Sequence, residues 1–156
     1  RNLTHLVLTL PLICQAAIRP MPVGADDLPT AASGYEYSLP DRFDLIHLGM
    51  GPDGHTASLV PGDPILDVTD RQVAITSGEY QGTHRMSLTY KAINRARQIM
   101  FLVTGEGKEE ALSKMIAGDE SVPSGSILKS KLKTTKHTKK PLLTRWPLAP
   151  SNNLHS

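Results

Sequence analysis

Two short apolar runs that each end in glycine are the clearest pattern along the chain. They occupy residues 43–49 and 98–105, and the second leads into a predicted helix over 108–116 with Gly118 as its C-cap. A compact apolar run of this length is typical of a parallel strand that is buried on both faces. Two such units predict an α/β domain with a parallel, Rossmann-like sheet, in which ligands bind at the carboxyl ends of the strands.

Weaker hydrophobic patterns predict the other elements. Pro11 kinks or ends an apolar helix near the start of the chain, and Asp26 and Asp27 stand just before a helix, where the helix dipole favours acidic residues. These elements are a helix over 3–17, a strand over 18–23, a helix over 28–39, strands over 72–76 and 86–89, and a helical turn over 93–96.

Charge divides the chain into an acidic body and a basic tail. Residues 1–120 hold all 15 acidic residues and 10 of the 17 basic ones, whereas residues 121–156 hold 7 basic residues and no acidic one. From residue 129 the sequence is low in complexity and like-charged, so we expect one domain over 1–128 and little fixed structure over 129–156. The acidic body does not favour nucleic acid as a partner. The basic tail leaves open a non-catalytic fragment that binds polyanions.

Length and cysteine content narrow the class of protein. A chain of 156 residues fits one domain that can bury a core without disulfides or metal. Cys14 is the single cysteine, which excludes a disulfide framework and favours a reducing, cytoplasmic setting. The apolar stretch over 6–18 is interrupted by polar residues and a proline, and it is shorter than the roughly 20 residues that cross a bilayer. We expect no membrane partner and, because the chain opens at Arg1, no signal peptide and a cut beginning.

The loop after the first apolar run carries the strongest candidate chemistry. Residues 49–59 read GMGPDGHTASL, in which the glycines let the backbone approach a ligand closely. Asp53 and His55 fit a general-base pair, because a histidine takes a proton from water near neutral pH and a carboxylate holds its ring in the required tautomer. An Asp-Gly-His turn beside a solvated histidine is the alternative interpretation. No group of residues has metal-ligand spacing, so we expect neither metal nor cofactor.

Three blocks of sequence resemble the 6-phosphogluconolactonase family. They are FDLIHLGMGPDGHTASLVP over 43–61, HRMSLT over 84–89 and FLVTGEGK over 101–108, and they stand in the order and spacing of the family. The resemblance covers residues 20–127 and implies the α/β fold of the lactonase and aminosugar-isomerase type. It also implies hydrolysis of 6-phospho-D-glucono-1,5-lactone, a small phosphorylated sugar lactone, to 6-phosphogluconate in the oxidative pentose phosphate pathway.

Glucosamine-6-phosphate deaminases are the alternative with the same loop. They are similar in the Gly-x-Gly-x-Asp-Gly-His core but continue with Ile-Ala-Phe-Asn-Glu-Pro, whereas this chain reads TASLVP over 56–61. Because the asparagine–glutamate pair is missing, the resemblance favours the lactonase over the aminosugar isomerisation.

The resemblance implies roles for the residues of the glycine loop. His55 would be the general base that draws a proton from water, and Asp53 would orient its ring. Gly49, Gly51 and Gly54 would contact the substrate, with backbone N–H groups stabilising the tetrahedral oxyanion.

Two basic residues outside the loop are implied to bind the substrate phosphate. Lys108 stands at a predicted helix start, where free N–H groups and the helix dipole favour an anion. Arg85 lies in the second block of resemblance. A solvated surface lysine and a surface salt bridge are the respective alternatives. His47 and His84 are expected to be packing or surface residues instead of ligands.

Both ends of the chain depart from the family pattern. The family carries a first strand and a Ser/Gly-rich phosphate-binding loop before the region that Arg1 begins, and a strand and helix with a tryptophan where the basic tail stands here. We therefore expect a domain that is incomplete at its N-terminus and weakly active or inactive as it stands. A homo-oligomer stays open.

Overall fold

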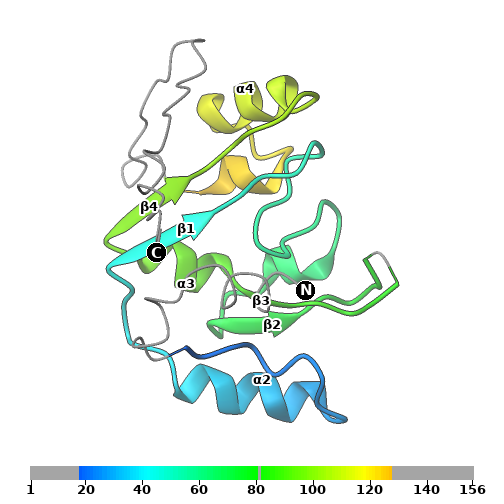
Figure 1. The fold of residues 1–156 in the computed structure, drawn as a ribbon, viewed down its shortest axis with the longest axis vertical. Coiled ribbons are helices and arrows are strands. Elements are labelled where there is room, and N and C mark those ends of the chain that lie inside the picture. The colour runs from blue at the N-terminus through cyan, green and yellow to red at the C-terminus, as the bar shows by residue number, and fades with distance from the viewer. Residues whose placement is uncertain (1–17, 81, 128–156) are drawn as a thin grey trace, which may run out of the picture.

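The computed structural model describes residues 18–80 and 82–127, so the predicted helix over 3–17 and the basic tail lie outside the described residues. Within that part, α2 lies at one end beside β2 and β3, and α4 lies at the other end beside the β1–β4 pair (Figure 1). The elements are α2 (Leu28–Tyr37), β1 (Leu45–Leu48), the 3₁₀ helix η2 (Pro64–Asp67), β2 (Val73–Ile75), β3 (Met86–Leu88), α3 (Tyr90–Arg95), β4 (Gln98–Phe101), α4 (Glu109–Ala117) and the 3₁₀ helix η3 (Pro123–Ser126).

The two apolar runs form a parallel pair of strands, as the sequence predicts. Leu45 pairs with Gln98 and Leu48 with Phe101, and the pair is continued when the Leu102 N–H donates to the Leu48 carbonyl at 2.8 Å. Parallel strands need a long crossover between them, and the chain from 49 to 97 supplies it. The loop that follows β1 is thereby placed at the carboxyl end of a parallel strand.

Burial of the β1–β4 pair differs from the prediction. Side chains along β1 alternate between exposed and buried, so that Ile46 and Leu48 face the core while Leu45 and His47 face outward. Leu45 is 50% exposed and Met100 on β4 is 42% exposed. The prediction of strands buried on both faces is therefore wrong for the described residues, in which only one face of the pair is covered.

The strands β2 and β3 form a separate two-stranded antiparallel sheet instead of extending the parallel pair. The segment between them, residues 76–85, is short enough to turn the chain back directly but too short for a parallel crossover. Thr76 and Arg85 continue the pairing, because the Thr76 N–H donates to the Arg85 carbonyl at 2.8 Å. The described residues thus combine one parallel and one antiparallel pair.

Helix α2 confirms the predicted element, although it ends two residues earlier than the predicted 28–39. Asp27 is its N-cap and accepts a hydrogen bond from the Thr30 N–H at 3.1 Å. The segment 18–23 is not the predicted strand. Pro20 and Pro22 account for this, because proline has no N–H to donate to a strand ladder.

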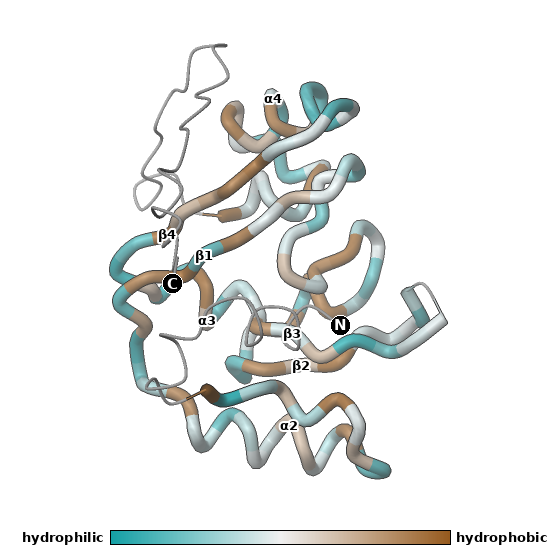
Figure 2. Tube along the Cα trace, viewed as in Figure 1, coloured by the Kyte–Doolittle hydropathy of each residue, from teal (hydrophilic) through white to brown (hydrophobic). Residues whose placement is uncertain are grey.

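Apolar side chains from the strands and helices pack into three clusters. Figure 2 shows brown, apolar stretches along β1, β4 and β2. These strands contribute side chains to the main core. That core consists of Ile46, Leu48, Leu59, Ile65, Ala74, Ile93, Ala96, Ile99 and Ile127. Ala32 of α2 packs with Val73 and Met86, while Met50 packs with Ala111 and Met115 of α4. Met50 is thus anchored in the core directly between two glycines of the loop.

Helix α4 has the predicted C-cap, although its last residue is Ala117 and the predicted helix ends at residue 116. Gly118 is its C-cap in the left-handed conformation, with φ of 70°, which only glycine adopts without strain. No helix within residues 18–80 and 82–127 is long and apolar enough to cross a membrane.

Candidate active site

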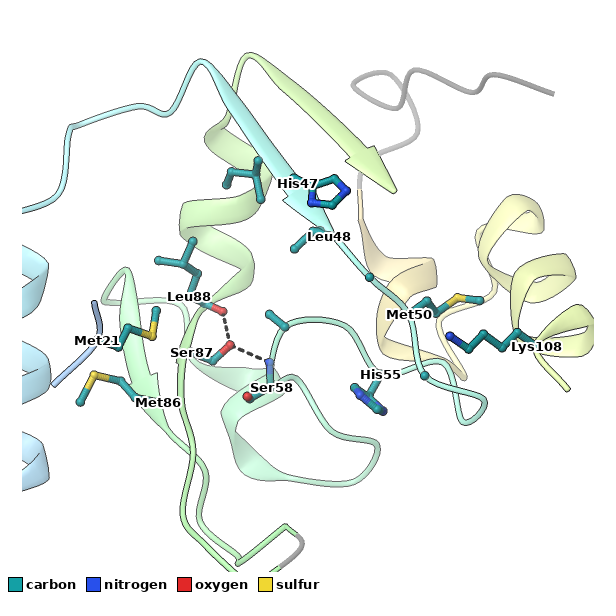
Figure 3. A pocket seen from close by; sticks show the side chains of 14 residues that line it. Met21, His47, Leu48, Met50, His55, Ser58, Met86, Ser87, Leu88 and Lys108 are labelled. Atoms are coloured by element: carbon teal, nitrogen blue, oxygen red, sulfur yellow. Dashed lines mark hydrogen bonds between the residues drawn. The ribbon is translucent and has the colours of Figure 1, made fainter. Parts of the chain in front are cut away.

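An open cavity of about 640 Å³ lies at the carboxyl end of β1. His55 and Lys108 lie toward one end of it, Met21 and Met86 toward the other, and Ser58 and Ser87 between them (Figure 3). Of the residues singled out from the sequence, Gly49, Gly51, His55 and Lys108 line the cavity. Asp53, Gly54 and Arg85 are not among the lining residues. The predicted residues are therefore only partly brought together at the cavity surface.

Hydrogen bonds within the glycine loop fix its shape. The Gly51 N–H donates to the His55 carbonyl at 2.9 Å, and the Gly54 N–H donates to the Gly51 carbonyl at 3.1 Å. The Thr56 hydroxyl donates to the Gly49 carbonyl at 2.8 Å and ties the end of the loop to its beginning. The loop is therefore closed by hydrogen bonds between its two ends, and the side chain of His55 lines the cavity from it.

Asp53 and His55 are paired as the sequence predicts. Nδ1 of His55 lies 2.6 Å from Oδ1 of Asp53, and the His55 backbone N–H donates to the same oxygen at 3.2 Å. An ionised carboxylate can only accept, so the Nδ1–H of the ring is the donor. In the neutral ring Nε2 of His55 then carries no proton, and it is the atom that can take one from a reactant.

Electrostatics keep Asp53 ionised in this pair. Burial opposes ionisation of the carboxyl, but the hydrogen bonds from the His55 backbone and ring, with the charge of the ring, outweigh it and lower the pKa of Asp53. The side chains of His55 and Asp53 are 24% and 39% exposed, so water reaches the pair. Asp53 is therefore a carboxylate acceptor for the ring at neutral pH.

Two of the three predicted oxyanion donors are already used. The N–H groups of Gly51 and Gly54 donate to carbonyl groups inside the loop, so in this conformation they hold its shape. The glycines are required for a different reason. A Cβ on Gly51 would overlap the His55 ring and lie 2.7 Å from Oδ1 of Asp53, and Gly54 has φ of 79° with Val122 against its Cα. The loop therefore needs glycine at 51 and 54, because other side chains lie where a Cβ would stand.

Lys108 reaches from the start of α4 toward the glycine loop (Figure 3). It is the N-cap residue of α4, which begins one residue later than the predicted helix over 108–116, and its side chain makes no capping hydrogen bond. Glu109 and Glu110 occupy the first turn and offset the positive end of the helix dipole. The Lys108 ammonium is therefore the main source of positive charge on the cavity wall at this helix.

Arg85 lies beside the cavity without lining it. Its guanidinium stands over the ring of Tyr80, with Cζ 5.7 Å from the ring centroid, and its Nε donates to the Tyr80 carbonyl at 3.3 Å. His84 does not enter the site, and its Nδ1 lies 3.1 Å from the Thr76 carbonyl. His47, in contrast, does line the cavity from β1.

Ser87 is a residue of the site to which the sequence pattern assigned no role. It is buried on β3, where its hydroxyl accepts from the Ser58 N–H at 3.0 Å and donates to the Leu88 carbonyl at 3.0 Å. Ala57, just before Ser58, has a left-handed φ of 52°. Ser87 thus holds the strained end of the glycine loop on the antiparallel pair.

The chain is similar in sequence to proteins of known activity. Residues 2–136 match the family described as glucosamine-6-phosphate isomerases/6-phosphogluconolactonase. The 6-phosphogluconolactonase of Synechocystis sp. is 44% identical over 115 residues, which are 67% of this chain and 47% of the relative. The human 6-phosphogluconolactonase is 34% identical over 131 residues, which are 77% of this chain and 49% of the relative. The chain thus spans about half the length of the curated relatives it matches.

The fold is similar to solved structures of the same family. The 6-phosphogluconolactonase of Thermotoga maritima is 30% identical, with a TM-score of 0.59 over 68% of this chain and 49% of that one. The 6-phosphogluconolactonase of Shewanella baltica has a TM-score of 0.65 over 76% of this chain and 55% of that one, and at 24% identity it supports the fold alone. Because the family match covers most of the chain and the fold agrees with it, the chain belongs to the glucosamine-6-phosphate isomerase/6-phosphogluconolactonase family.

Proposed function

We propose that this chain carries the catalytic loop of a 6-phosphogluconolactonase and hydrolyses 6-phospho-D-glucono-1,5-lactone to 6-phosphogluconate. The observation that carries the proposal is the 2.6 Å contact between Asp53 and His55 at a cavity that Lys108 also lines. The names of the relatives that match it support the same reaction. The test is hydrolysis of freshly prepared lactone by the purified chain, corrected for spontaneous ring opening.

In the proposed mechanism, His55 moves one proton twice. Its Nε2 accepts a proton from the water that attacks the lactone carbonyl, while Asp53 keeps Nδ1 protonated and stabilises the charged ring. The tetrahedral intermediate then collapses, the bond from the carbonyl carbon to the ring oxygen breaks, and that oxygen takes the proton from His55. Because Gly51 and Gly54 use their N–H groups inside the loop, the glycines act by shaping the loop around His55.

Lys108 is proposed to bind the substrate phosphate. Replacing Lys108 with alanine is expected to raise KM for the phosphorylated lactone by about tenfold or more, as loss of a charge-assisted contact does, and to leave hydrolysis of unphosphorylated gluconolactone nearly unchanged. The matched control is Lys114→Ala in the same helix, because Lys114 pairs with Glu110 at 2.8 Å away from the cavity lining. Equal losses on both lactones would show that Lys108 does not act through the phosphate.

Gly51 is proposed to be required for the Asp53–His55 contact. A Gly51→Ala substitution is expected to lower kcat by about 10²-fold, because the added Cβ displaces the His55 ring, and misplacement by about 1 Å costs that much. The clashing atoms are side chains of an accessible loop, so the melting temperature should change little. Gly34→Ala in α2 is the control, since a Cβ there meets nothing within 4 Å. An unchanged kcat in Gly51→Ala would contradict the proposed geometry.

Aminosugar-phosphate deamination is the rival activity within the family. A monomeric glucosamine-6-phosphate deaminase has a TM-score of 0.54 to this chain at 24% identity, which supports the fold alone. After His55 the chain makes a tight turn, in which the Leu59 N–H donates to the Thr56 carbonyl at 2.9 Å, and no carboxylate follows in residues 56–61. Release of ammonia from glucosamine-6-phosphate, measured on the same preparation, separates the two activities.

A further inference from the structure

Tyr80 contacts both His55 and Arg85. Its ring centroid lies 5.4 Å from that of the His55 imidazole, with 65° between the ring planes, which is an edge-to-face arrangement. The guanidinium of Arg85 stands 5.7 Å from the same centroid. One half-buried aromatic ring therefore touches the proposed base and a cation beside the cavity.

The segment that carries Tyr80 is held in place by several hydrogen bonds. The Tyr80 N–H donates to the Thr83 carbonyl at 3.0 Å, across a turn in which Gly82 has φ of 78°. Arg85, the residue before β3, donates from its Nε to the Tyr80 carbonyl.

Asp63 binds the backbone of the segment that carries Tyr80, although it lies outside that segment. Its carboxylate accepts from the backbone N–H groups of Ser77 and Gly78, each at 3.2 Å, and from that of Ile65 at 2.8 Å. Tyr80 is therefore presented to His55 from a braced turn, not from a free loop end.

A second contact on His55 is needed for a defined geometry. Asp53 fixes Nδ1, but a ring held at one atom can still swing about that hydrogen bond and carry Nε2 away from the reactant. A contact on another part of the ring removes this freedom, and locked rotamers are what hold a catalytic group within about 0.5 Å of its productive position.

We propose that Tyr80 is a positioning residue for His55, and that the same ring fixes the Arg85 guanidinium relative to it. The inference rests on the proposed function and adds a residue to its site. Tyr80 acts through its ring, since both contacts are made with the aromatic face or edge. Its hydroxyl has no part in the proposal.

The activity test compares two substitutions at Tyr80 in the full chain. Tyr80→Leu removes the ring and is expected to lower kcat on unphosphorylated gluconolactone about tenfold with KM unchanged, because a mobile His55 is less often correctly placed. Tyr80→Phe keeps the ring and should retain kcat within about twofold. Tyr37→Leu is the control, as Tyr37 is 92% exposed on α2. Tyr80→Met serves as the ring-free variant if the leucine variant does not fold.

A second measurement is independent of turnover. The ring protons of His55 should show a ring-current shift in the NMR spectrum that Tyr80→Phe retains and Tyr80→Leu loses. A parent chain without lactonase activity would contradict the proposed function but leave this NMR test standing. If kcat and the His55 shifts in Tyr80→Leu both match the parent, or if Tyr80→Phe loses as much kcat as Tyr80→Leu, the positioning role is wrong.

Discussion

Replacing His55 with asparagine is expected to lower kcat for lactone hydrolysis by about 10²–10⁴, or to the spontaneous rate, with little change in KM. Asparagine keeps a polar side chain of similar reach, so the loop hydrogen bonds made by the His55 backbone should survive. What is lost is an atom that accepts a proton from water and returns it to the leaving oxygen. The fall in rate therefore measures proton transfer, not folding.

The decisive comparison is with the second histidine of the cavity. His47 also lines the cavity, from β1, but it lies outside the Asp53 pair. His47→Asn should leave kcat within about threefold, because no carboxylate among residues 18–80 and 82–127 pairs with its ring. If His47→Asn lowers kcat more than His55→Asn does, His47 and not His55 is the general base. Turnover of His55→Asn within threefold of the parent would remove His55 from the mechanism.

The parts of the site that could be predicted from sequence have local signals. An apolar run that ends in glycine marks a strand and its loop whatever the rest of the chain does, and β1 and β4 were found in this way. Asp53 and His55 stand two residues apart, so their 2.6 Å contact needs only the turn that joins them. Gly118 was found as a C-cap for the same reason.

The contacts that sequence reasoning missed join distant segments. Tyr80 meets His55 only because β2 and β3 turn back on each other and Asp63 braces the segment between them. Ser87 reaches the Ser58 N–H across two elements. Neither residue type is unusual in a strand or turn, so composition and spacing carried no signal. The oxyanion role of the glycine loop stays a prediction, and the N–H groups of Gly51 and Gly54 donate inside the loop itself.

Sheet burial was mispredicted for a related reason. An apolar run indicates that a strand tends to be buried, but which faces are covered depends on the elements packed against them. In the described residues, one face of the β1–β4 pair packs on the core and the other leaves Leu45, Met100 and Leu102 at 42–60% exposure. This uncovered face bears directly on how well the glycine loop is supported.

The 156-residue chain is expected to have a kcat/KM at least about 10²-fold below that of the Synechocystis 6-phosphogluconolactonase. Among the described residues β1 pairs only with β4, so the strand that ends at the glycine loop has one unpaired edge as well as an uncovered face. Such an edge invites pairing with other chains, and a loop on a two-stranded base is held less rigidly than one on a full sheet.

The size of the expected loss in kcat/KM follows from the distance between the general base His55 and the proposed phosphate-binding residue Lys108. The Asp53–His55 pair lies in the loop after β1 and Lys108 is the N-cap of α4, so their relative position depends on the packing of Met50 against Ala111 and Met115. A displacement near 1 Å between His55 and the substrate phosphate lowers kcat/KM by about 10²-fold.

The measurement is kcat/KM for the monodisperse chain, for the Synechocystis enzyme and for a chimera that joins the N-terminal half of that enzyme to this chain. The chimera should recover most of the loss, because the added chain can pair with the edge of β1 that has no partner among the described residues. Equal values for the chain and the chimera would show that the two-stranded base holds the site unaided.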